Sequence, residues 1–367
     1  MLINKDKKMS KDSNIEWTGN TWPIVTGCDP DSDGCANCYA VLESWIHSHH
    51  PNPKISDVFA GTVRKSTNGK LQWTGQINLQ PQRLKWILEW GNWENPELVF
   101  VANLGDLFHE KVPFEFIDEA VAYMIIARWN IYQILTKRPE IMHQYFTSPD
   151  RLQKIQSALV KAKSEILETK LTKRVRKLVE ESCRFLEETE LKLPLDHLWL
   201  GYSVCTQKDA EDVYYLLKTP AKIRFLSCEP VLEDIDLSEY LSEFIGAGIC
   251  DGCGEQRDIL YAVDAAPVAG LAICNQCIPR LSWCILGGES GHNARVCEIE
   301  HLRTACSSAS LSLTKACQKA QVRIFIKQLG AKPMLDNAPY KISDKKGGIL
   351  SEFPEDLQIR EFLLVNQ

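Results

Sequence analysis

The sequence predicts an α/β fold built as a complete or partial (β/α) barrel, and two observations support this prediction. Eight short apolar segments rich in Val, Ile and aromatic residues recur along the 367-residue chain, at 22–26, 76–79, 98–103, 131–136, 198–204, 223–228, 283–288 and 322–327. Such runs are typical of strands covered on both faces. Segments with helical patterns lie between them, and this alternation indicates a parallel sheet.

Two of the intervening helices can be placed from their apolar spacing. Pro113 to Trp129 places one apolar stripe toward a core, formed by Phe116, Ala120, Tyr123, Met124 and Ala127. His301 to Gln321 predicts a second helix, with Leu302, Cys306 and Leu313 facing inward.

Composition excludes several classes of protein. Apolar residues make up 44% and charged residues 25% of the chain, which excludes a largely disordered protein. The net charge of −6 gives no global attraction for nucleic acid, although a local basic patch is compatible with it. The longest apolar runs are strand-sized, and the polar residues 1–8 lack the apolar core of a signal peptide. We therefore expect a cytoplasmic protein with no membrane partner.

Two segments interrupt the alternation and divide the chain into five parts. Residues 148–195 are rich in Lys, Glu, Leu and Arg and contain no Gly, which predicts a helical insertion, either one long helix or a helical hairpin. Its stretch 161–177 holds seven basic and two acidic residues, and is either a solvated helix face or an arm for nucleic acid or a partner. The second insertion is 244–281, so the barrel would comprise 1–147 with the cysteine loop, 196–243 and 282–367 with the tail.

The second insertion carries the spacing of a four-thiolate zinc ribbon. Cys250 and Cys253 form one CxxC turn, and Cys274 and Cys277 form another after twenty intervening residues. Each turn presents two thiolates to one tetrahedral ion. Four thiolates leave no open position on the metal, so the spacing predicts structural Zn²⁺; an iron–sulfur cluster and a site without metal are the alternatives.

Three further cysteines follow the first predicted strand, at Cys28, Cys35 and Cys38. Three thiolates can hold a [4Fe–4S] cluster and leave one iron open for a ligand such as S-adenosyl-L-methionine. Zinc completed by His47, His49, His50 or a distant residue is an alternative. A packing cluster, and calcium held by Asp29, Asp31 and Asp33, are two more.

Polar side chains follow most of the predicted strands. They are Gly27-Cys28, Asn103 to Asp106, Thr136 to Pro139, Ser203 to Cys205, Ser227 to Pro230, Gly287 to Gly291 and Lys327-Gln328. The carboxyl ends of barrel strands build the active site in this class of fold. We therefore expect these groups to converge on one cavity.

Several blocks of this sequence resemble blocks of one protein family, and they follow one another in the same order as in that family. They are 14–28, 32–40, 99–110, 133–140, 198–204, 224–230, 285–291 and 325–330. The family is of bacteriophage type, is largely uncharacterised and is grouped as radical S-adenosylmethionine (radical SAM)-like, three-cysteine proteins. The resemblance implies a barrel of radical SAM type with a [4Fe–4S] cluster on Cys28, Cys35 and Cys38. The first cysteine interval is longer than the usual C-x3-C-x2-C, and Asn37 stands where an aromatic residue often precedes the third cysteine, while Tyr39 follows it.

The resemblance also suggests roles for the strand-end residues. Lys137 or Arg138 would pair the cofactor carboxylate, since Arg offers a bidentate fork. Asp106 and Glu229 would take ribose hydroxyls or substrate, or else cap helices or form ion pairs with Arg138 or Lys327. The turn Gly287-Gly288-Glu289-Ser290 resembles the Gly-Gly-Glu turn that receives the cofactor amino group, and Tyr39 would lie near the adenine.

The favoured function is thus an enzyme that cleaves S-adenosyl-L-methionine to a 5′-deoxyadenosyl radical, with catalytic roles for Asp106, Lys137 and Glu229. Its substrate is unknown, and a nucleic-acid base or nucleotide is favoured. An external electron donor of the flavodoxin or ferredoxin type would reduce the cluster. The alternatives are a non-catalytic nucleic-acid or protein-binding barrel with structural metals, and a zinc-dependent hydrolase or lyase.

Overall fold

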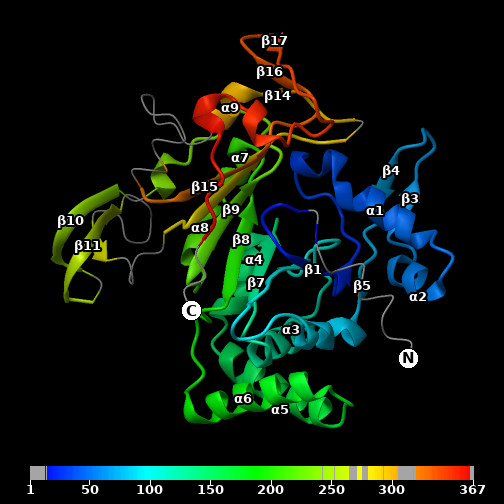
Figure 1. The fold of residues 1–367 in the computed structure, drawn as a ribbon, viewed down its shortest axis with the longest axis vertical. Helices are drawn as coiled ribbons and strands as arrows, with labels where there is room; N and C mark the ends of the chain where they lie inside the picture. The colour runs from blue at the N-terminus through cyan, green and yellow to red at the C-terminus, as the bar shows by residue number, and fades with distance from the viewer. Residues whose placement is uncertain are drawn as a thin grey trace. The chain divides into compact units, whose positions relative to one another are not determined.

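The computed structural model describes residues 13, 15–241, 243–251, 253–263, 271–274, 280–291, 293–304, 317 and 320–363 (Figure 1). The chain divides into two compact units. The first unit comprises Met1–Pro30, Cys38–Leu200 and Pro220–Lys222, and the second comprises Asp31–Asn37, Gly201–Thr219 and Ile223–Gln367. The boundary passes through the cysteine loop, and the five-part division expected from composition stays a prediction.

The described residues form a mixed α/β structure whose largest sheet has seven strands in the order β1-β6-β7-β8-β9-β13-β15. Their bounds are Asn20–Trp22, Leu98–Val101, Ile131–Thr136, Leu198–Ser203, Ile223–Cys228, Trp283–Gly287 and Arg323–Gln328. The pairs β1/β6 and β6/β7 in the first unit are parallel, as are β9/β13 and β13/β15 in the second. Sheet order follows chain order, which agrees with the predicted partial (β/α) barrel.

The segment 76–79 was wrongly predicted as a strand of this sheet. Its residues Asn78–Leu79 form β5, which pairs antiparallel with β2 (Val25–Thr26). Asn78 and Leu79 are only half-buried, so they lack the cover on both faces that a barrel strand has. The first strand of the large sheet ends at Trp22, because Pro23 has no N–H to continue the ladder.

Helix α3 (Phe114–Ile126) forms much of the apolar interior of the first unit. The predicted stripe is confirmed, since its five residues are buried. Burial extends around the helix to ten of its thirteen residues. A helix buried on nearly all sides needs cover from other elements.

That cover includes α5 (Arg151–Leu167) and α6 (Lys173–Glu188). Because they are two separate helices, the alternative of one long helix is wrong, and the helical hairpin stays compatible with the structure. Arg151, at the start of α5, is fully buried and donates from Nη1 to both carboxylate oxygens of Asp118 on α3, at 2.7 and 2.8 Å. The Tyr145 hydroxyl donates to the same carboxylate at 2.8 Å. This buried ion pair fastens the start of α5 to α3.

The remaining helices and strands of the first unit are short. They are α1 (Tyr39–Ser48), α2 (Pro53–Ser56), α4 (Pro139–Thr147), β3 (Val63–Lys65) and β4 (Leu71–Trp73), with 3-10 helices at Asp57–Phe59 and Pro81–Glu89. Strands β3 and β4 pair antiparallel.

The second unit holds two smaller sheets beside its part of the large one. β10 (Glu243–Ile249), β11 (Gln256–Val263) and β12 (Leu271–Cys274) form an antiparallel sheet, and β14 (Cys297–Glu298), β16 (Pro333–Leu335) and β17 (Ala338–Pro339) form another. Its helices are α7 (Gln207–Ala210), α8 (Val213–Lys218) and α9 (Ile299–Thr304), with 3-10 helices at Asp33–Asn37, Ser238–Tyr240, Leu350–Glu352 and Glu355–Leu357.

The helix predicted over 301–321 begins at Ile299 and is described as far as Thr304. Leu302 is buried as expected, whereas Cys306 and Leu313 lie outside the described residues. No helix within the described ranges is long and apolar enough to span a bilayer.

Candidate functional site

Three strand ends of the first unit bring polar side chains together around Arg138. This arginine follows β7 and is 7% exposed. Its Nη2 lies 2.6 Å from Oδ1 of Asp29, and its Nη1 lies 3.2 Å from Oδ2 of Asp106 and 3.9 Å from Sγ of Cys28. Three of the seven strand ends that were expected to converge therefore meet within this unit.

Asp106 is already engaged by donors of the chain. Its carboxylate accepts from the Thr136 hydroxyl at 2.8 Å, from the backbone N–H of Phe108 at 2.9 Å and from that of Lys137 at 3.1 Å, in addition to Arg138. The side chain of Asp106 is buried. Its ion pair with Arg138 is one of the two ion pairs that the sequence suggested. Asp106 thus holds the end of β7 and orients Arg138.

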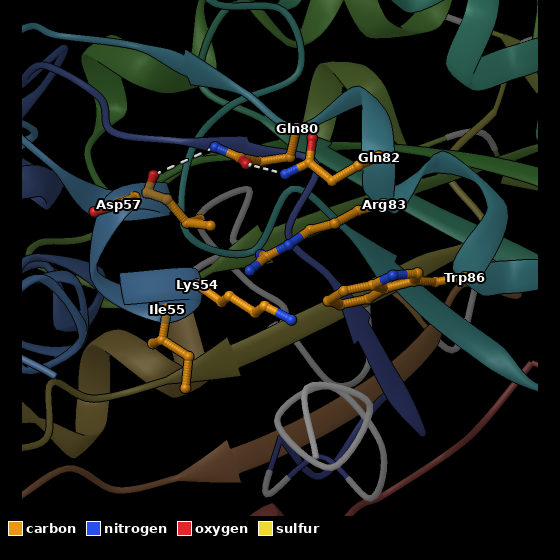
Figure 2. A pocket seen from close by; sticks show the side chains of 8 residues that line it. Lys54, Ile55, Asp57, Gln80, Gln82, Arg83 and Trp86 are labelled. Atoms are coloured by element: carbon orange, nitrogen blue, oxygen red, sulfur yellow. Dashed lines mark hydrogen bonds between the residues drawn. The ribbon is translucent and has the colours of Figure 1, made fainter. Parts of the chain in front are cut away.

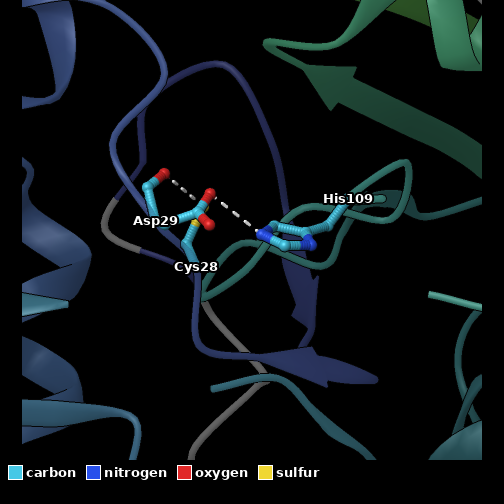
Figure 3. Close-up of side chains that lie close together, drawn as sticks. All are labelled: Cys28, Asp29 and His109. Atoms are coloured by element: carbon cyan, nitrogen blue, oxygen red, sulfur yellow. Dashed lines mark hydrogen bonds and ion pairs between the residues drawn. The ribbon is translucent and has the colours of Figure 1, made fainter. Parts of the chain in front are cut away.

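His109 is fully buried. Its Nδ1 accepts from the backbone N–H of Lys111 at 3.1 Å, so the proton lies on Nε2, which is 3.0 Å from Oδ1 of Asp29. His109 therefore donates to Asp29, and Figure 3 draws this contact as a dashed line. Asp29 receives hydrogen bonds from two buried side chains, those of His109 and Arg138.

Cys28, Asp29 and His109 have ligand atoms that all lie within 4.8 Å of one another (Figure 3). Thiolate, carboxylate and imidazole are all zinc ligands, and three of them would leave one open position. Two features oppose a mononuclear metal at this place. The proton on His109 Nε2 occupies its coordinating atom, and the Arg138 cation is already paired with Asp29.

The cysteines of the loop are all half-buried. Cys28 and Cys38 pack against one apolar cluster of the first unit, formed by Ala40, Val41, Val58, Phe59, Val63, Trp73 and Leu104. Cys35 lies on the 3-10 helix Asp33–Asn37, which belongs to the second unit. Tyr39, next to Cys38, is 49% exposed and its hydroxyl donates to the Asn103 carbonyl at 3.0 Å.

In the second unit, Glu229 and Lys327 form an ion pair, which is the second of the two that the sequence suggested. Nζ of Lys327 lies 3.1 Å from Oε1 of Glu229, and the Ser227 hydroxyl donates to Oε2 at 3.1 Å. The ends of β9 and β15 thus meet within this unit. Glu229 keeps 14% side-chain exposure, more than the 7% of Asp106.

The Gly287-Gly288-Glu289 turn makes close contact with the end of β15. A Cβ on Gly288 would lie 2.3 Å from the Leu329 carbonyl oxygen, so this position requires glycine for packing. The carbonyls of Gly287, Gly288 and Glu289 accept from Val231 N, Gln328 Nε2 and Ala331 N respectively. These carbonyl oxygens were expected to face a cofactor amino group. Each of them already accepts one hydrogen bond from within the chain. Ser290 is half-buried.

Glu289 is tied to the cysteine loop. Its carboxylate accepts from Arg295 Nη2 at 2.8 Å and Nε at 3.1 Å, and from Asn37 Nδ2 at 3.0 Å. Arg295 Nη1 also donates to the Asp33 carbonyl at 2.9 Å. Burial by itself raises the pKa of Glu289, but the hydrogen bonds from Arg295 and Asn37 outweigh burial and place that pKa below its usual value. We name Glu289, Arg295 and Asn37 the loop latch.

Sequence reasoning missed Arg295 and Asn37 as functional residues, and considered Asp29 only as a calcium ligand. Lys137, predicted to be catalytic, has a half-buried side chain, and its backbone N–H donates to Oδ2 of Asp106. Arg138, expected to hold a cofactor carboxylate, is committed to two carboxylates of the chain itself.

The first CxxC turn is fastened to the strand that ends in the third cysteine of the predicted zinc site. Cys250 directly follows β10 and is buried, whereas Cys253 is exposed. Asp251 donates from its backbone N–H to the Ala272 carbonyl at 2.9 Å and accepts from Ala272 N at 2.7 Å. Cys274 is the last residue of β12, and Cys277 lies outside the described residues. These two hydrogen bonds therefore place Asp251, next to Cys250, beside Ala272, two residues before Cys274.

Comparison with known proteins gives one finding. A family model described as a protein of unknown function (DUF5131) matches residues 12–351, which is most of the chain. No curated protein and no solved structure matches it significantly.

Proposed function

The chain belongs to the DUF5131 family, and we propose that it is a radical SAM-like enzyme whose cysteines Cys28, Cys35 and Cys38 hold a [4Fe–4S] cluster. The cluster, when bound, supplies the electron for reductive cleavage of S-adenosyl-L-methionine. The three thiols stand on eleven consecutive residues, 28–38, and Cys35 is at most about 11 Å along the chain from Cys38.

The observation that carries this proposal is the contact of the Arg138 guanidinium with Cys28. A cluster ligand must be a thiolate, and a neighbouring cation lowers the free energy of the thiolate relative to the thiol. Arg138 keeps its charge at any ordinary pH, and it approaches Sγ to 3.9 Å from a buried position. The apolar side chains beside Cys28 and Cys38 provide a low-dielectric wall, which suits an oxygen-sensitive [4Fe–4S] group.

The residues around Asp29 would act as supports of the loop. Arg138 and His109 both donate to Asp29, the residue after Cys28. These two hydrogen bonds fix the direction of the backbone after β2, and with it the direction of the first cysteine of the loop. In the second unit the loop latch binds the segment that contains Cys35. Each unit thus holds one part of the cysteine loop through buried or half-buried charged groups.

A zinc-dependent hydrolase or lyase is the second candidate, because Cys28, Asp29 and His109 form a compact ligand group. It requires His109 to move its proton to Nδ1 and give up the hydrogen bond from Lys111, and it places a dication beside Arg138. These two costs favour the [4Fe–4S] cluster over a zinc ion at Cys28, Asp29 and His109. For the separate CxxC pair, we propose structural zinc on Cys250, Cys253, Cys274 and Cys277.

The test is anaerobic reconstitution with iron and sulfide, followed by iron, sulfide and zinc analysis and an absorbance spectrum. We expect about four irons per chain with a band near roughly 400 nm, and about one zinc. Cys35→Ala should lose the iron and the release of 5′-deoxyadenosine while keeping the zinc. Cys183→Ala, which alters a half-buried cysteine on α6, is the matched control and should keep all three.

Two outcomes would overturn the proposal. One is about two zinc ions per chain with no iron after reconstitution, which would favour the hydrolase or a binding protein. The other is unchanged 5′-deoxyadenosine release by Cys35→Ala.

A further inference from the structure

The first unit contains a pocket that the proposed chemistry does not use. Its volume is about 360 Å³, and it is lined by Lys54, Ile55, Asp57, Val58, Gln80, Gln82, Arg83 and Trp86 (Figure 2). This volume falls within the range of roughly 300–1,000 Å³ that is typical of small-molecule sites. The walls come from α2, the 3-10 helix that follows it and the 3-10 helix Pro81–Glu89.

The charges of the lining favour an anion. Lys54 and Arg83 are cationic, and Asp57 is the acidic residue of the lining. Arg83 is 5% exposed, and its Nη1 donates to the Pro23 carbonyl at 3.0 Å, which fixes the guanidinium in place. Lys54 is exposed and carries its charge on a mobile stem. A fixed cation beside a mobile one suits a phosphate group.

The pocket also offers an aromatic surface. The Arg83 guanidinium lies 4.7 Å from the centre of the Trp86 ring, so one side of the indole is already stacked. Trp86 is half-buried, and Figure 2 shows its ring and the Lys54 ammonium directed into the same pocket. Stacking of a base on an aromatic side chain contributes about 1–3 kcal/mol.

Two amides complete the lining in a fixed geometry. Gln80 donates from Nε2 to the Val58 carbonyl at 3.3 Å, and Gln82 donates from Nε2 to Oε1 of Gln80 at 2.7 Å. Gln82 retains its carbonyl oxygen, and Asp57 its carboxylate, as acceptors at the exposed side. Such acceptors match the N–H groups of a base or the hydroxyls of a ribose.

We propose that this pocket binds a nucleoside 5′-phosphate unit, with its base against Trp86 and its phosphate at Lys54 and Arg83. The inference is independent of the cluster, because no lining residue is a cysteine of the loop. Val58 connects the two regions: it lines the pocket, and it belongs to the apolar cluster against which Cys28 and Cys38 pack.

The test is isothermal titration of the full chain with adenosine 5′-monophosphate, adenosine, inorganic phosphate and an adenine hexanucleotide. We expect the monophosphate to bind at least tenfold more tightly than adenosine or phosphate alone. Trp86→Leu should weaken it by about 5- to 150-fold, the equivalent of the stacking energy, and Trp86→Phe should restore most of the affinity. Lys54→Gln should weaken it and reduce its dependence on salt.

Lys85→Gln is the matched control, because Lys85 is an exposed neighbour of Trp86 outside the lining. Tighter binding of the hexanucleotide than of the monophosphate would identify a strand as the source of the nucleotide unit, and the reverse would identify a free nucleotide. Absence of binding at millimolar ligand, equal affinity for phosphate alone, or a Trp86→Leu variant that binds like Lys85→Gln would overturn the proposal.

Discussion

Arg138 Nη2 lies 2.6 Å from Oδ1 of Asp29, so a cation at the end of β7 holds the residue that directly follows Cys28. The two residues are 109 positions apart in the chain. The same guanidinium contacts Asp106, which is itself bonded to the end of β7. The entry of the cysteine loop is therefore set by two parallel strands of the sheet and not by the loop alone.

We predict that Arg138→Gln destabilises the first unit and empties the cluster site. Removing one partner of a buried ion pair leaves Asp106 uncompensated, and this costs about 3–5 kcal/mol. Urea denaturation should show that loss, and the iron content after reconstitution should fall with it. Arg138→Lys should restore part of the stability, since an ammonium can pair with one of the two carboxylates but not fork between them.

Arg176→Gln, on the exposed side of α6, serves as the control for loss of a positive charge. Equal iron content in Arg138→Gln and Arg176→Gln would show that the contact with Cys28 has no part in holding the cluster.

The loop latch leads to a prediction with a defined pH dependence. Glu289 has a lowered pKa in the folded chain, so its ionised form adds stability above the unfolded pKa, and this contribution is lost as the pH falls through the folded pKa. Glu289→Gln removes the contribution. The difference in unfolding free energy between wild type and variant should be constant near neutral pH and shrink below about pH 4.3. A difference that does not change down to acidic pH would contradict the role of the carboxylate charge.

The sequence predicted those parts of the fold that depend on local pattern. Six of the eight apolar segments coincide with strands of the large sheet, because strands buried on both faces are continuous apolar runs, whereas 22–26 shares only Trp22 with β1. Residues 76–79 have a similar composition, but pair with β2, since local pattern does not specify a partner. Asn37 and Glu289 meet across 252 residues, and Asp29 and His109 across 80. Contacts at such separations are set by tertiary packing, so one sequence could place these residues at strand ends but not pair them.

We predict that Asp251→Ala weakens zinc binding although Asp251 is no proposed ligand. Its carboxylate accepts from Ala272 N and holds the first CxxC turn on the strand that ends at Cys274. Loss of a charge-assisted hydrogen bond of about 1.5 kcal/mol corresponds to roughly tenfold in affinity. Competition with a chelator should show this loss, and Asp251→Asn, which keeps an acceptor oxygen, should recover most of it. Cys253→Ser should release the zinc outright, and zinc retention by Cys253→Ser would exclude Cys253 as a ligand.

The buried pair of Arg151 and Asp118 allows the contribution of the α5 attachment to be measured. Arg151→Met should lower the free energy of unfolding by about 3–5 kcal/mol, because Asp118 is 4% exposed and would keep only the Tyr145 hydroxyl as a side-chain donor among the contacts described. The cation also lies 4.1 Å from the centre of the Tyr145 ring, so part of the loss comes from that contact.

The double variant Arg151→Met with Asp118→Leu separates the ion pair from the packing around it. Replacing both charges by apolar groups of similar volume is often neutral, so the double variant should be more stable than Arg151→Met. Urea denaturation of the wild type, both single variants and the double variant gives the coupling energy directly. If the loss in the double variant equalled the sum of the two single losses, the coupling energy would be zero, and the two charges would stabilise the chain independently and not as an ion pair.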